Sequence, residues 1–385
     1  MVLPRPSFTV GIEEEYMLID PQTRDLISDP DPAMFAKCQE LLGDRVTHEL
    51  LRSQIEVNTR PYSSITALGE DLRRLRGAVV STAREFGMEV IASSTHPFAQ
   101  WWEQQVVADE RYLMLAGDMQ TLAHRLVTGG MHVHVGIEDP DMRIDLMGQV
   151  TYFLAHLLAL STSSPFWGGQ DTGLKSYRLN VFRSLPRTGL PEVFDSWSAY
   201  QRHVDVLVGA GIIEDASKVW WDIRPSSRYP TLEMRITDVC TKIEDALTVA
   251  TTYVCLLSML FRLRTNNQKW RSYATFLLDE NVWRAQRYGS TDSLMDFGQR
   301  RLVPFSELAE EMVDILTPEA EELGCLPQLN RVRQIVMDGT SAEHQLWAFR
   351  RALNSGATQR EALVEVVDML VSNTAANLDS GAGDR

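Results

Sequence analysis

The chain has 385 residues, of which 44% are hydrophobic and 23% charged, so an ordinary folded protein is expected rather than a disordered or fibrous one. Lysine and arginine total 37 against 52 acidic residues, and the formal net charge of −15 argues against a surface that follows nucleic-acid phosphates. Four widely separated cysteines fit reduced thiols in a cytoplasmic protein better than a disulfide scaffold. Neither a secretory signal nor a membrane span is predicted, because the longest apolar stretch, YFLAHLLAL, is much shorter than about 20 residues.

The first predicted element is a strand over residues 8–19, FTVGIEEEYMLI. Its two-residue alternation places apolar side chains on one face and both Glu13 and Glu15 on the other. Two carboxylates on one face repel each other unless a cation or hydrogen-bond donors lie between them, so this pair suits a hard divalent cation. A solvated acidic strand edge is the alternative. Glu14 faces the other way and is expected to be structural.

Two helices follow, over residues 31–43 and 64–86, each with a glycine at its C-terminal end. Between them, Glu49 and Glu56 lie in HELLRSQIEVNTRP. On one straight strand these two side chains would be on opposite faces, so they share a site only if the chain bends between them. Surface carboxylates are the alternative for this pair.

The remaining elements are predicted from periodicity and turn residues. They are strands at 88–93 and 128–137, helices at 109–126 and 139–164, a long ordered loop at 164–191, a hairpin of strands at 218–225 and 231–239, a helix to residue 263 that begins at a capping box over 241–244, and a mostly helical region after 300. This order predicts one α+β domain over residues 1–376 with an antiparallel sheet, followed by a disordered tail at 377–385.

Within the strand at 128–137, His132 and His134 alternate with valines, so both imidazoles lie on one face. An HxH pair on a strand can bind a metal, whereas a buried histidine satisfied by a neighbour is the ordinary alternative. The glycine pair Gly129-Gly130 before it indicates that another group approaches the backbone closely.

The predicted hairpin carries an acid and an arginine on each strand. Glu233 and Arg235 lie two residues apart on one face, and Asp222 and Arg224 repeat this spacing on the preceding strand. A carboxylate beside a guanidinium suits a metal and a phosphate held side by side, while an internal salt-bridge ladder is the alternative. No P-loop, strand-linked GxGxxG or GxSxG motif occurs, which argues against P-loop chemistry and a serine nucleophile.

Several segments together resemble the carboxylate–amine ligase family called glutamate–cysteine ligase type 2, of the glutamine synthetase superfamily. They are FTVGIEEEY, the Glu49–Glu56 segment, GGMHVHVG, SPFWGGQDTGLKSYR, RSLPRTG, WDIRP, TLEMRITDV and ENVWRAQRYG. The resemblance implies an antiparallel, barrel-like sheet, flanked by helices, that forms a funnel for divalent metals, ATP and an acidic substrate.

The resemblance also implies residue roles. By that likeness Glu13, His132 and Glu233 hold one Mg²⁺ or Mn²⁺, and Glu15, Glu49 and Glu56 hold a second. Arg235 matches the arginine that contacts the transferred phosphate, and Arg178 and Arg224 match further nucleotide-side positions whose duties are unassigned, as is that of Arg187. His134 is carried as either a ligand or a group that positions one.

The implied activity is ATP-dependent amide formation through an acyl phosphate, with glutamate as the carboxylate substrate and cysteine or another amine as acceptor. A metal-dependent hydrolase that uses the HxH and the carboxylates is the runner-up, but it leaves the arginines without a role. A non-catalytic relative is the third reading, and the carboxylates at every matched position argue against it. The expected partners are small-molecule substrates, with no nucleic acid and no membrane, and the oligomeric state stays open.

Overall fold

The computed structural model describes residues 4–378, the side chain of residue 111 excepted. Its centre is an antiparallel sheet in the order β10-β11-β5-β1-β3-β2, with β4 paired to the end of β1. The strands of this sheet are β1 (Val10–Ile19), β2 (Val46–His48), β3 (Gln54–Asn58), β4 (Glu89–Ile91), β5 (Met131–Gly136), β10 (Ile223–Pro225) and β11 (Thr231–Met234). Three two-stranded pairings lie outside it: β6 (Phe166–Trp167) with β7 (Gln170–Asp171), β8 (Thr188–Gly189) with β9 (Trp220–Trp221), and β12 (Ser293–Asp296) with β13 (Arg301–Pro304).

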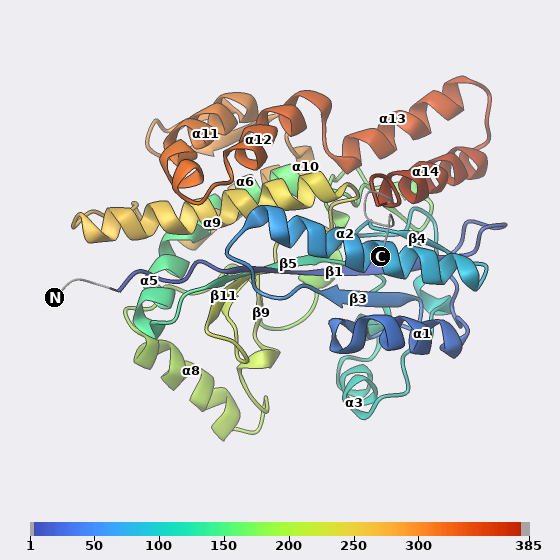
Figure 1. The fold of residues 1–385 in the computed structure, drawn as a ribbon, viewed down its shortest axis with the longest axis horizontal. Helices are drawn as coiled ribbons and strands as arrows, with labels where there is room; N and C mark the ends of the chain where they lie inside the picture. Colours follow the sequence, from blue (N-terminus) through green and yellow to red (C-terminus); the bar gives the residue numbers. More distant parts are fainter. Residues whose placement is uncertain (1–3, 379–385) are drawn as a thin grey trace, which may run out of the picture.

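Helices α2 and α9 run across one face of the sheet, α11 and α12 lie beyond α9, and α13 and α14 pack together beside β4 (Figure 1). The helices of the described residues are α1 (Pro32–Leu42), α2 (Ile65–Glu85), α3 (Glu110–Met119), α4 (Thr121–His124), α5 (Pro140–Val150), α6 (Leu154–Ser161), α7 (Tyr177–Phe182), α8 (Trp197–Gly209), α9 (Ile243–Thr265), α10 (Thr275–Tyr288), α11 (Phe305–Glu322), α12 (Leu326–Asp338), α13 (Ser341–Asn354) and α14 (Gln359–Thr374). This arrangement confirms the predicted α+β class with an antiparallel sheet.

Strand β1 organises the molecule because its two faces meet different surroundings. Ile12, Tyr16 and Leu18 belong to the large apolar core shared with α2 and α9. Met17 and Ile19, on the other face, belong to a second apolar cluster that includes residues of α13 and α14. The alternation predicted from the sequence therefore separates an apolar face under the helices from the face that carries Glu13 and Glu15.

Glu14 points into the core, as predicted, where it forms a buried ion pair with Arg76 of α2. Arg76 Nη2 lies 2.8 Å from Glu14 Oε2, and both side chains are fully buried. Tyr16 donates a hydrogen bond to the same carboxylate, and Arg76 also donates to the carbonyls of Thr241 and Cys240. Because all these partners are buried, the charges are compensated, and this pair ties the central strand to α2.

The helix predictions were correct where a local cap sets the boundary. Helix α1 begins at an Asp31 cap, and α2 begins at a Ser64 cap. The predicted helix at 109–126 is instead two helices, α3 and α4, separated at Gln120, whose φ is +50°. The predicted capping box at 241–244 was wrong: α9 begins after Lys242, and the Thr241 hydroxyl donates to the Ala92 carbonyl.

Two helical segments have the length and hydropathy of a membrane span, which the sequence analysis did not single out. They are Pro140–Ser161, which comprises α5, a 3₁₀ turn (Thr151–Phe153) and α6, and Ile243–Thr265, which is α9. The most apolar window of each is mostly inside the structure, 83% and 89% buried respectively. Both are core helices, and α9 is apolar on all sides because it has the sheet on one side and α11 and α12 on the other.

Seven of the nine residues of the predicted tail, 379–385, lie outside the described residues. Leu378, within that prediction, packs against the large core, where its Cβ lies opposite Gly77 of α2.

Candidate active site

The face of the sheet opposite α2 and α9 gathers five glutamates and two histidines by strand register. On the two sides of β1, Glu13 stands opposite His132 of β5, and Glu15 stands opposite Glu56 of β3. Glu233 of β11 stands opposite His134 of β5. Three neighbouring strand pairs thus bring together residues that are more than 200 positions apart in the sequence.

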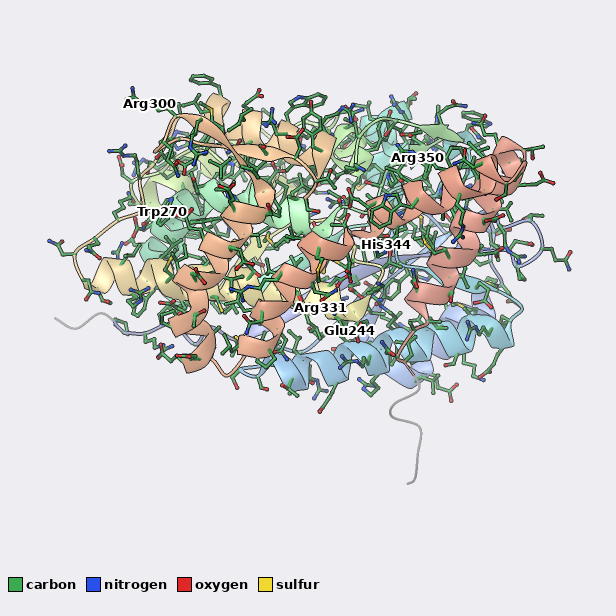
Figure 2. The ribbon with its side chains drawn as sticks, turned by 90° about the horizontal axis from the view of Figure 1, so that it is seen from above. Glu244, Trp270, Arg300, Arg331, His344 and Arg350 are labelled. Atoms are coloured by element: carbon green, nitrogen blue, oxygen red, sulfur yellow. The ribbon has the colours of Figure 1, made fainter. Side chains whose placement is uncertain are left out.

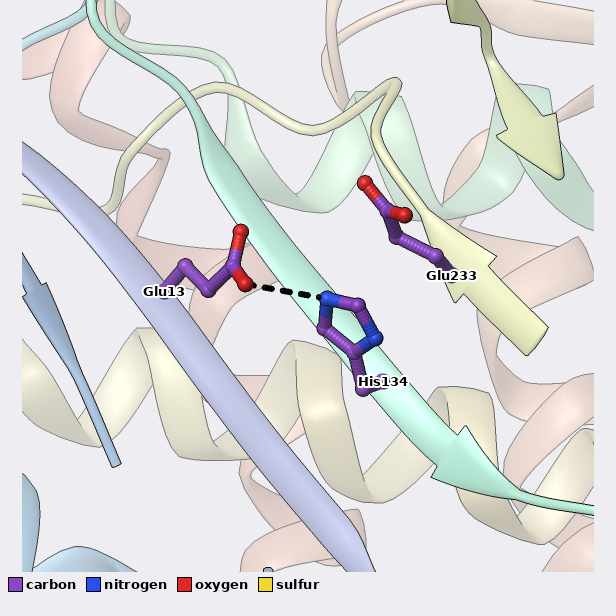
Figure 3. Close-up of side chains that lie close together, drawn as sticks. All are labelled: Glu13, His134 and Glu233. Atoms are coloured by element: carbon purple, nitrogen blue, oxygen red, sulfur yellow. Dashed lines mark ion pairs between the residues drawn. The ribbon is translucent and has the colours of Figure 1, made fainter. Parts of the chain in front are cut away.

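The first acidic group is Glu13, His134 and Glu233, each from a different strand (Figure 3). One potential ligand atom of each lies within 4.8 Å of the others. His134 Nε2 lies 3.1 Å from Glu13 Oε1, and His134 Nδ1 lies 2.9 Å from the hydroxyl of Thr231. The threonine fixes the orientation of the imidazole ring, which is the usual role of a hydrogen bond to the far nitrogen of a metal-binding histidine.

The second acidic group is Glu15, Glu49 and Glu56, whose ligand atoms also lie within 4.8 Å of one another. The chain turns between β2 and β3, so Glu49 leaves the end of β2 and meets Glu56 on β3. This is the bend that the sequence analysis required before the two carboxylates were able to share a site. Sequence spacing alone did not show it.

His132 lies between these two acidic groups. Its Nδ1 is 3.0 Å from Glu13 Oε2, and its Nε2 is 3.9 Å from Glu15 Oε1. The resemblance placed His132 with Glu13 and Glu233, but the geometry gathers His134 with that pair instead. Both histidines project from one face of β5, so two-residue spacing gives no means of choosing between them.

Burial and charge give the two acidic groups opposite protonation behaviour. Burial alone would raise the pKa of Glu13, but hydrogen bonds and charge from His132 and His134 lower it well below its usual value. Burial and the neighbouring Glu56 carboxylate raise the pKa of Glu15 to about 7, and burial also raises the pKa values of Glu49 and Glu56. The second group therefore holds three buried carboxyl groups that repel one another when ionised, a setting that a divalent cation would relieve.

Arg235 is the arginine best placed to receive an anion at this face. Its Nη1 donates to Glu233 Oε1 and lies 3.4 Å from His132 Nδ1. Its Nε is buried and has no hydrogen-bond partner in the described part of the chain. A buried donor without a partner is costly, so a bound anionic group such as a phosphate would satisfy it.

The other predicted arginines are engaged with the protein itself. Arg224 forms a two-point pair with Glu233 and donates to the carbonyls of Ser217 and Val219. Arg178 is buried, donates to the carbonyls of Arg235 and Ile236, and lies near Glu15. Arg187 lies over the Trp220 ring and donates to the carbonyl of Lys218. These contacts indicate positioning roles for Arg224 and Arg178, and they place Arg187 away from the two acidic groups.

The close approach predicted at Gly129-Gly130 is made by Arg178. A Cβ atom at Gly130 would lie 2.4 Å from Arg178 Nη2. The Gly130 amide also donates to Glu15 Oε2 at 2.7 Å, so this glycine lies between the second acidic group and the guanidinium.

The repeated acid–arginine spacing on the hairpin was misleading for Asp222. Its carboxylate pairs with Arg183 of α7, a partner that the sequence analysis did not identify, and it joins neither acidic group. Its carbonyl accepts hydrogen bonds from the amides of both Arg235 and Ile236. Two successive amides on one carbonyl form a β-bulge, which ends regular pairing of β11 just where Arg235 leaves the strand.

Asp238 is a second residue that sequence reasoning missed. It is fully buried and accepts hydrogen bonds from the Ser163 amide and the hydroxyls of Ser164 and Ser176. These bonds fasten the loop at 164–176 to the chain that follows β11, and its charge faces Arg178. Nothing local marks this aspartate, because all three donors are more than 60 residues away.

Antiparallel strands that carry two carboxylate groups beside an unsatisfied guanidinium define a site for hard cations and an anion. Comparison with known proteins gives the family. The model of glutamate–cysteine ligase family 2 matches residues 9–369. A putative glutamate–cysteine ligase 2 of Rhodospirillum rubrum is 55% identical over 382 residues, which cover 98% of each chain, and one of Chloroflexus aggregans is 39% identical over 96% of this chain and 92% of its own.

The chain therefore belongs to glutamate–cysteine ligase family 2, and it is an ATP-dependent ligase that forms a carbon–nitrogen bond. Two solved structures share its fold at low sequence identity. A glutamate–cysteine ligase from Francisella tularensis in complex with AMP has a TM-score of 0.69 at 12% identity and covers 99% of this chain and 91% of its own. A bifunctional glutathione synthetase from Pasteurella multocida has a TM-score of 0.68 at 13% identity over 95% of this chain and 52% of its own.

Proposed function

We propose that this ligase joins the γ-carboxyl group of glutamate to an amine through an enzyme-bound acyl phosphate, with two Mg²⁺ or Mn²⁺ ions held by the two acidic groups. The observation that supports this most is the pairing of those groups with Arg235, whose buried Nε has no partner among the described residues. Glutamate as the donor, and cysteine as the first acceptor to test, follow the names of the relatives.

The donor set fits hard cations. Carboxylate oxygens with one imidazole are the ligands that magnesium and manganese accept, and all four cysteines are buried and lie in neither group. Glu13, His134 and Glu233 would hold one ion, with Thr231 orienting the imidazole, and Glu15, Glu49 and Glu56 the other. When bound, the ions neutralise the charge that otherwise keeps a carboxylate and a nucleotide phosphate apart.

The residues then have defined roles in the two steps. In the first step, a carboxylate oxygen of glutamate attacks the γ-phosphorus of ATP, ADP leaves, and Arg235 donates hydrogen bonds to the phosphoryl group in transit. In the second step, the amine attacks the acyl carbon, inorganic phosphate leaves with the former carboxylate oxygen, and the amine loses a proton. Arg224 and Arg178 position Glu233 and the segment that carries Arg235.

The test follows the oxygen atoms. With glutamate labelled by oxygen-18 in its γ-carboxyl group, we expect one labelled oxygen in the released phosphate for each amide formed. Label in AMP, and none in phosphate, would indicate adenylation and contradict the acyl phosphate. A panel of amines, with ADP release as the readout, would identify the acceptor.

Family membership gives no support to the hydrolase alternative, and a hydrolase would leave Arg235 without a substrate group to bind. The small-molecule substrates of a ligase are in keeping with a cytoplasmic enzyme, and that location is part of the proposal. The four cysteines are free and buried, as expected in a reducing compartment.

A further inference from the structure

A second cavity, of about 350 Å³, lies away from the sheet. Its walls come from the 3₁₀ turn and helix at 151–161, from α11, and from two connecting segments at 269–273 and 296–298. None of its lining residues belongs to the seven-stranded sheet, so it is separate from the candidate active site. Figure 2 shows one of these residues, Trp270, at the end of the molecule where α9 ends. The volume is within the range of small-molecule pockets.

One side of this cavity is aromatic. Tyr152 has its ring centre 5.6 Å from that of Trp270 and 5.7 Å from that of Tyr273, and Phe153 lies 4.9 Å from Trp270. The facing wall is apolar and consists of Leu308, Met312 and Ile315 of α11. Rings grouped in this way present negatively polarised faces to a ligand.

His156 gives the cavity a polar group that the fold itself does not use. The residue is 4% exposed, lines the cavity, and its Nδ1 has no hydrogen-bond partner among the described residues. Burial lowers the pKa of His156 to about 4, so the ring is neutral near pH 7 and one nitrogen accepts a hydrogen bond. A buried acceptor left without a partner is unfavourable unless a ligand or water satisfies it.

Two carboxylates, Asp296 and Glu311, complete the lining beside the rings. Both contribute, after burial, to raising the pKa of Tyr152, which places their charges near its hydroxyl group. The cavity also meets Lys269 and Arg271, but both are exposed, and Lys269 Nζ lies 3.6 Å from Asp145 Oδ1. The less exposed part of the cavity is therefore anionic and aromatic.

We propose that this cavity binds a small organic cation, an ammonium group that carries an aromatic or other apolar body. The ammonium group sits over the faces of Tyr152, Trp270 and Tyr273, where a cation is attracted to the ring, and its charge is balanced by Asp296 and Glu311. One of its protons is donated to His156 Nδ1, and the body of the ligand packs on α11. This site needs neither metal ion of the proposed ligase reaction.

The test compares three probes of the same shape by isothermal titration of the full chain: 2-phenylethylamine, 2-phenylethanol and 3-phenylpropionate. We expect saturable binding of the amine, about tenfold or more tighter than that of the neutral alcohol or the acid. Equal affinities for amine and alcohol, or no saturable binding of the amine at millimolar concentration, would overturn the assignment.

A matched pair of variants on α11 locates the binding. Glu311→Gln removes a charge that lines the cavity, whereas Glu310→Gln changes its neighbour, which pairs with Arg333 on the surface. We expect the first to weaken amine binding about tenfold and the second to leave it unchanged. The active-site variant Glu15→Gln should also leave it unchanged. If Glu15→Gln abolishes amine binding and Glu311→Gln does not, the amine occupies the active site, and the cavity proposal is wrong.

Discussion

Glu13 and Glu15 stand two residues apart on β1, yet their surroundings act on their carboxyl groups in opposite directions. Glu13 has two histidines within about hydrogen-bond distance, which favour its charged form. Glu15 has Glu56 beside it, which disfavours the charged form. The sequence predicted the shared face correctly, because strand alternation needs only local information. It was unable to predict the different neighbours, because these come from β3 and β5.

Removal of either charge should stop the reaction while the fold remains. We expect Glu13→Gln and Glu15→Gln each to lower ATP turnover by about 100-fold or more, the scale of losing an electrostatic catalytic contact. Glu89→Gln is the control, because Glu89 is on β4 of the same sheet and pairs only with Arg84. Near-normal turnover in both active-site variants, with circular dichroism unchanged, would remove the metal site from this account.

Glu233→Gln should also lower turnover but is a less clean test of catalysis. Its carboxylate pairs with both Arg224 and Arg235, so the variant leaves two buried guanidinium groups without their anion. A loss of stability is therefore expected in addition to the loss of activity.

The two arginines that share Glu233 should separate into a functional and a structural one. Arg235→Lys keeps the charge but loses the planar fork, so kcat should fall with little change in melting temperature. Arg224→Lys should lower the melting temperature more, because Arg224 also donates to the carbonyls of Ser217 and Val219. Should Arg235→Lys instead unfold the protein and leave kcat per folded molecule unchanged, Glu233–Arg235 is a salt bridge and nothing more.

Protonation of the second acidic group should make magnesium binding depend on pH. The folded pKa of Glu15, about 7, is above its ordinary value of 4.5, and those of Glu49 and Glu56 are also raised. Without metal, this group stabilises the fold fully below its unfolded pKa, and the stability is lost as the pH rises through about 7. Magnesium binds the ionised carboxylates and restores the loss.

The increase in melting temperature on adding magnesium should therefore be larger at about pH 8 than at about pH 5.5, as measured by differential scanning fluorimetry against EDTA. Glu49→Gln should reduce both the metal-free pH dependence and the magnesium effect. A magnesium effect of equal size at both pH values would show that these carboxyl groups do not control metal binding.

Among the elements, those with local signals were predicted well and those set by distant partners were not. Helices α1 and α2 have their caps in their own sequence, at Asp31 and Ser64. Thr241 and Glu244 have the spacing of a capping box, but the Thr241 hydroxyl bonds to Ala92, about 150 residues earlier in the chain. The bulge at Asp222 and the turn that brings Glu49 to Glu56 likewise depend on which strands become neighbours.

The attachment of β1 to α2 through Glu14 and Arg76 should be one of the strongest single contacts in the fold. We expect Glu14→Gln to lower the free energy of unfolding by about 3–5 kcal/mol, because it leaves the fully buried Arg76 without its counter-charge. Urea unfolding measures this, and Glu89→Gln, which breaks the exposed pair with Arg84, should cost at most about 1 kcal/mol. Equal small losses in both variants would mean that water or a shifted partner compensates Arg76.

At the scale of the whole molecule, the single domain predicted over residues 1–376 stays a prediction, and β1 supplies the argument for it. Leu18 belongs to the core that extends through α2 and α9 to α11 and α12, while Ile19, the next residue, belongs to the cluster with α13 and α14. Two apolar clusters that share one strand are not able to separate without breaking that strand's contacts. The family model, which matches residues 9–369, is in keeping with one unit.

This shared strand leads to a prediction about unfolding. Leu18→Ala and Ile19→Ala should each remove about 2–5 kcal/mol, and both should shift one common transition, because the loss of either cluster releases β1. The transition is followed in urea by circular dichroism and by tryptophan fluorescence, whose curves should coincide for the parent chain and for both variants. If Ile19→Ala instead produces an early transition that Leu18→Ala lacks, then α13 and α14 unfold separately, and residues 1–376 contain two cooperative units rather than one.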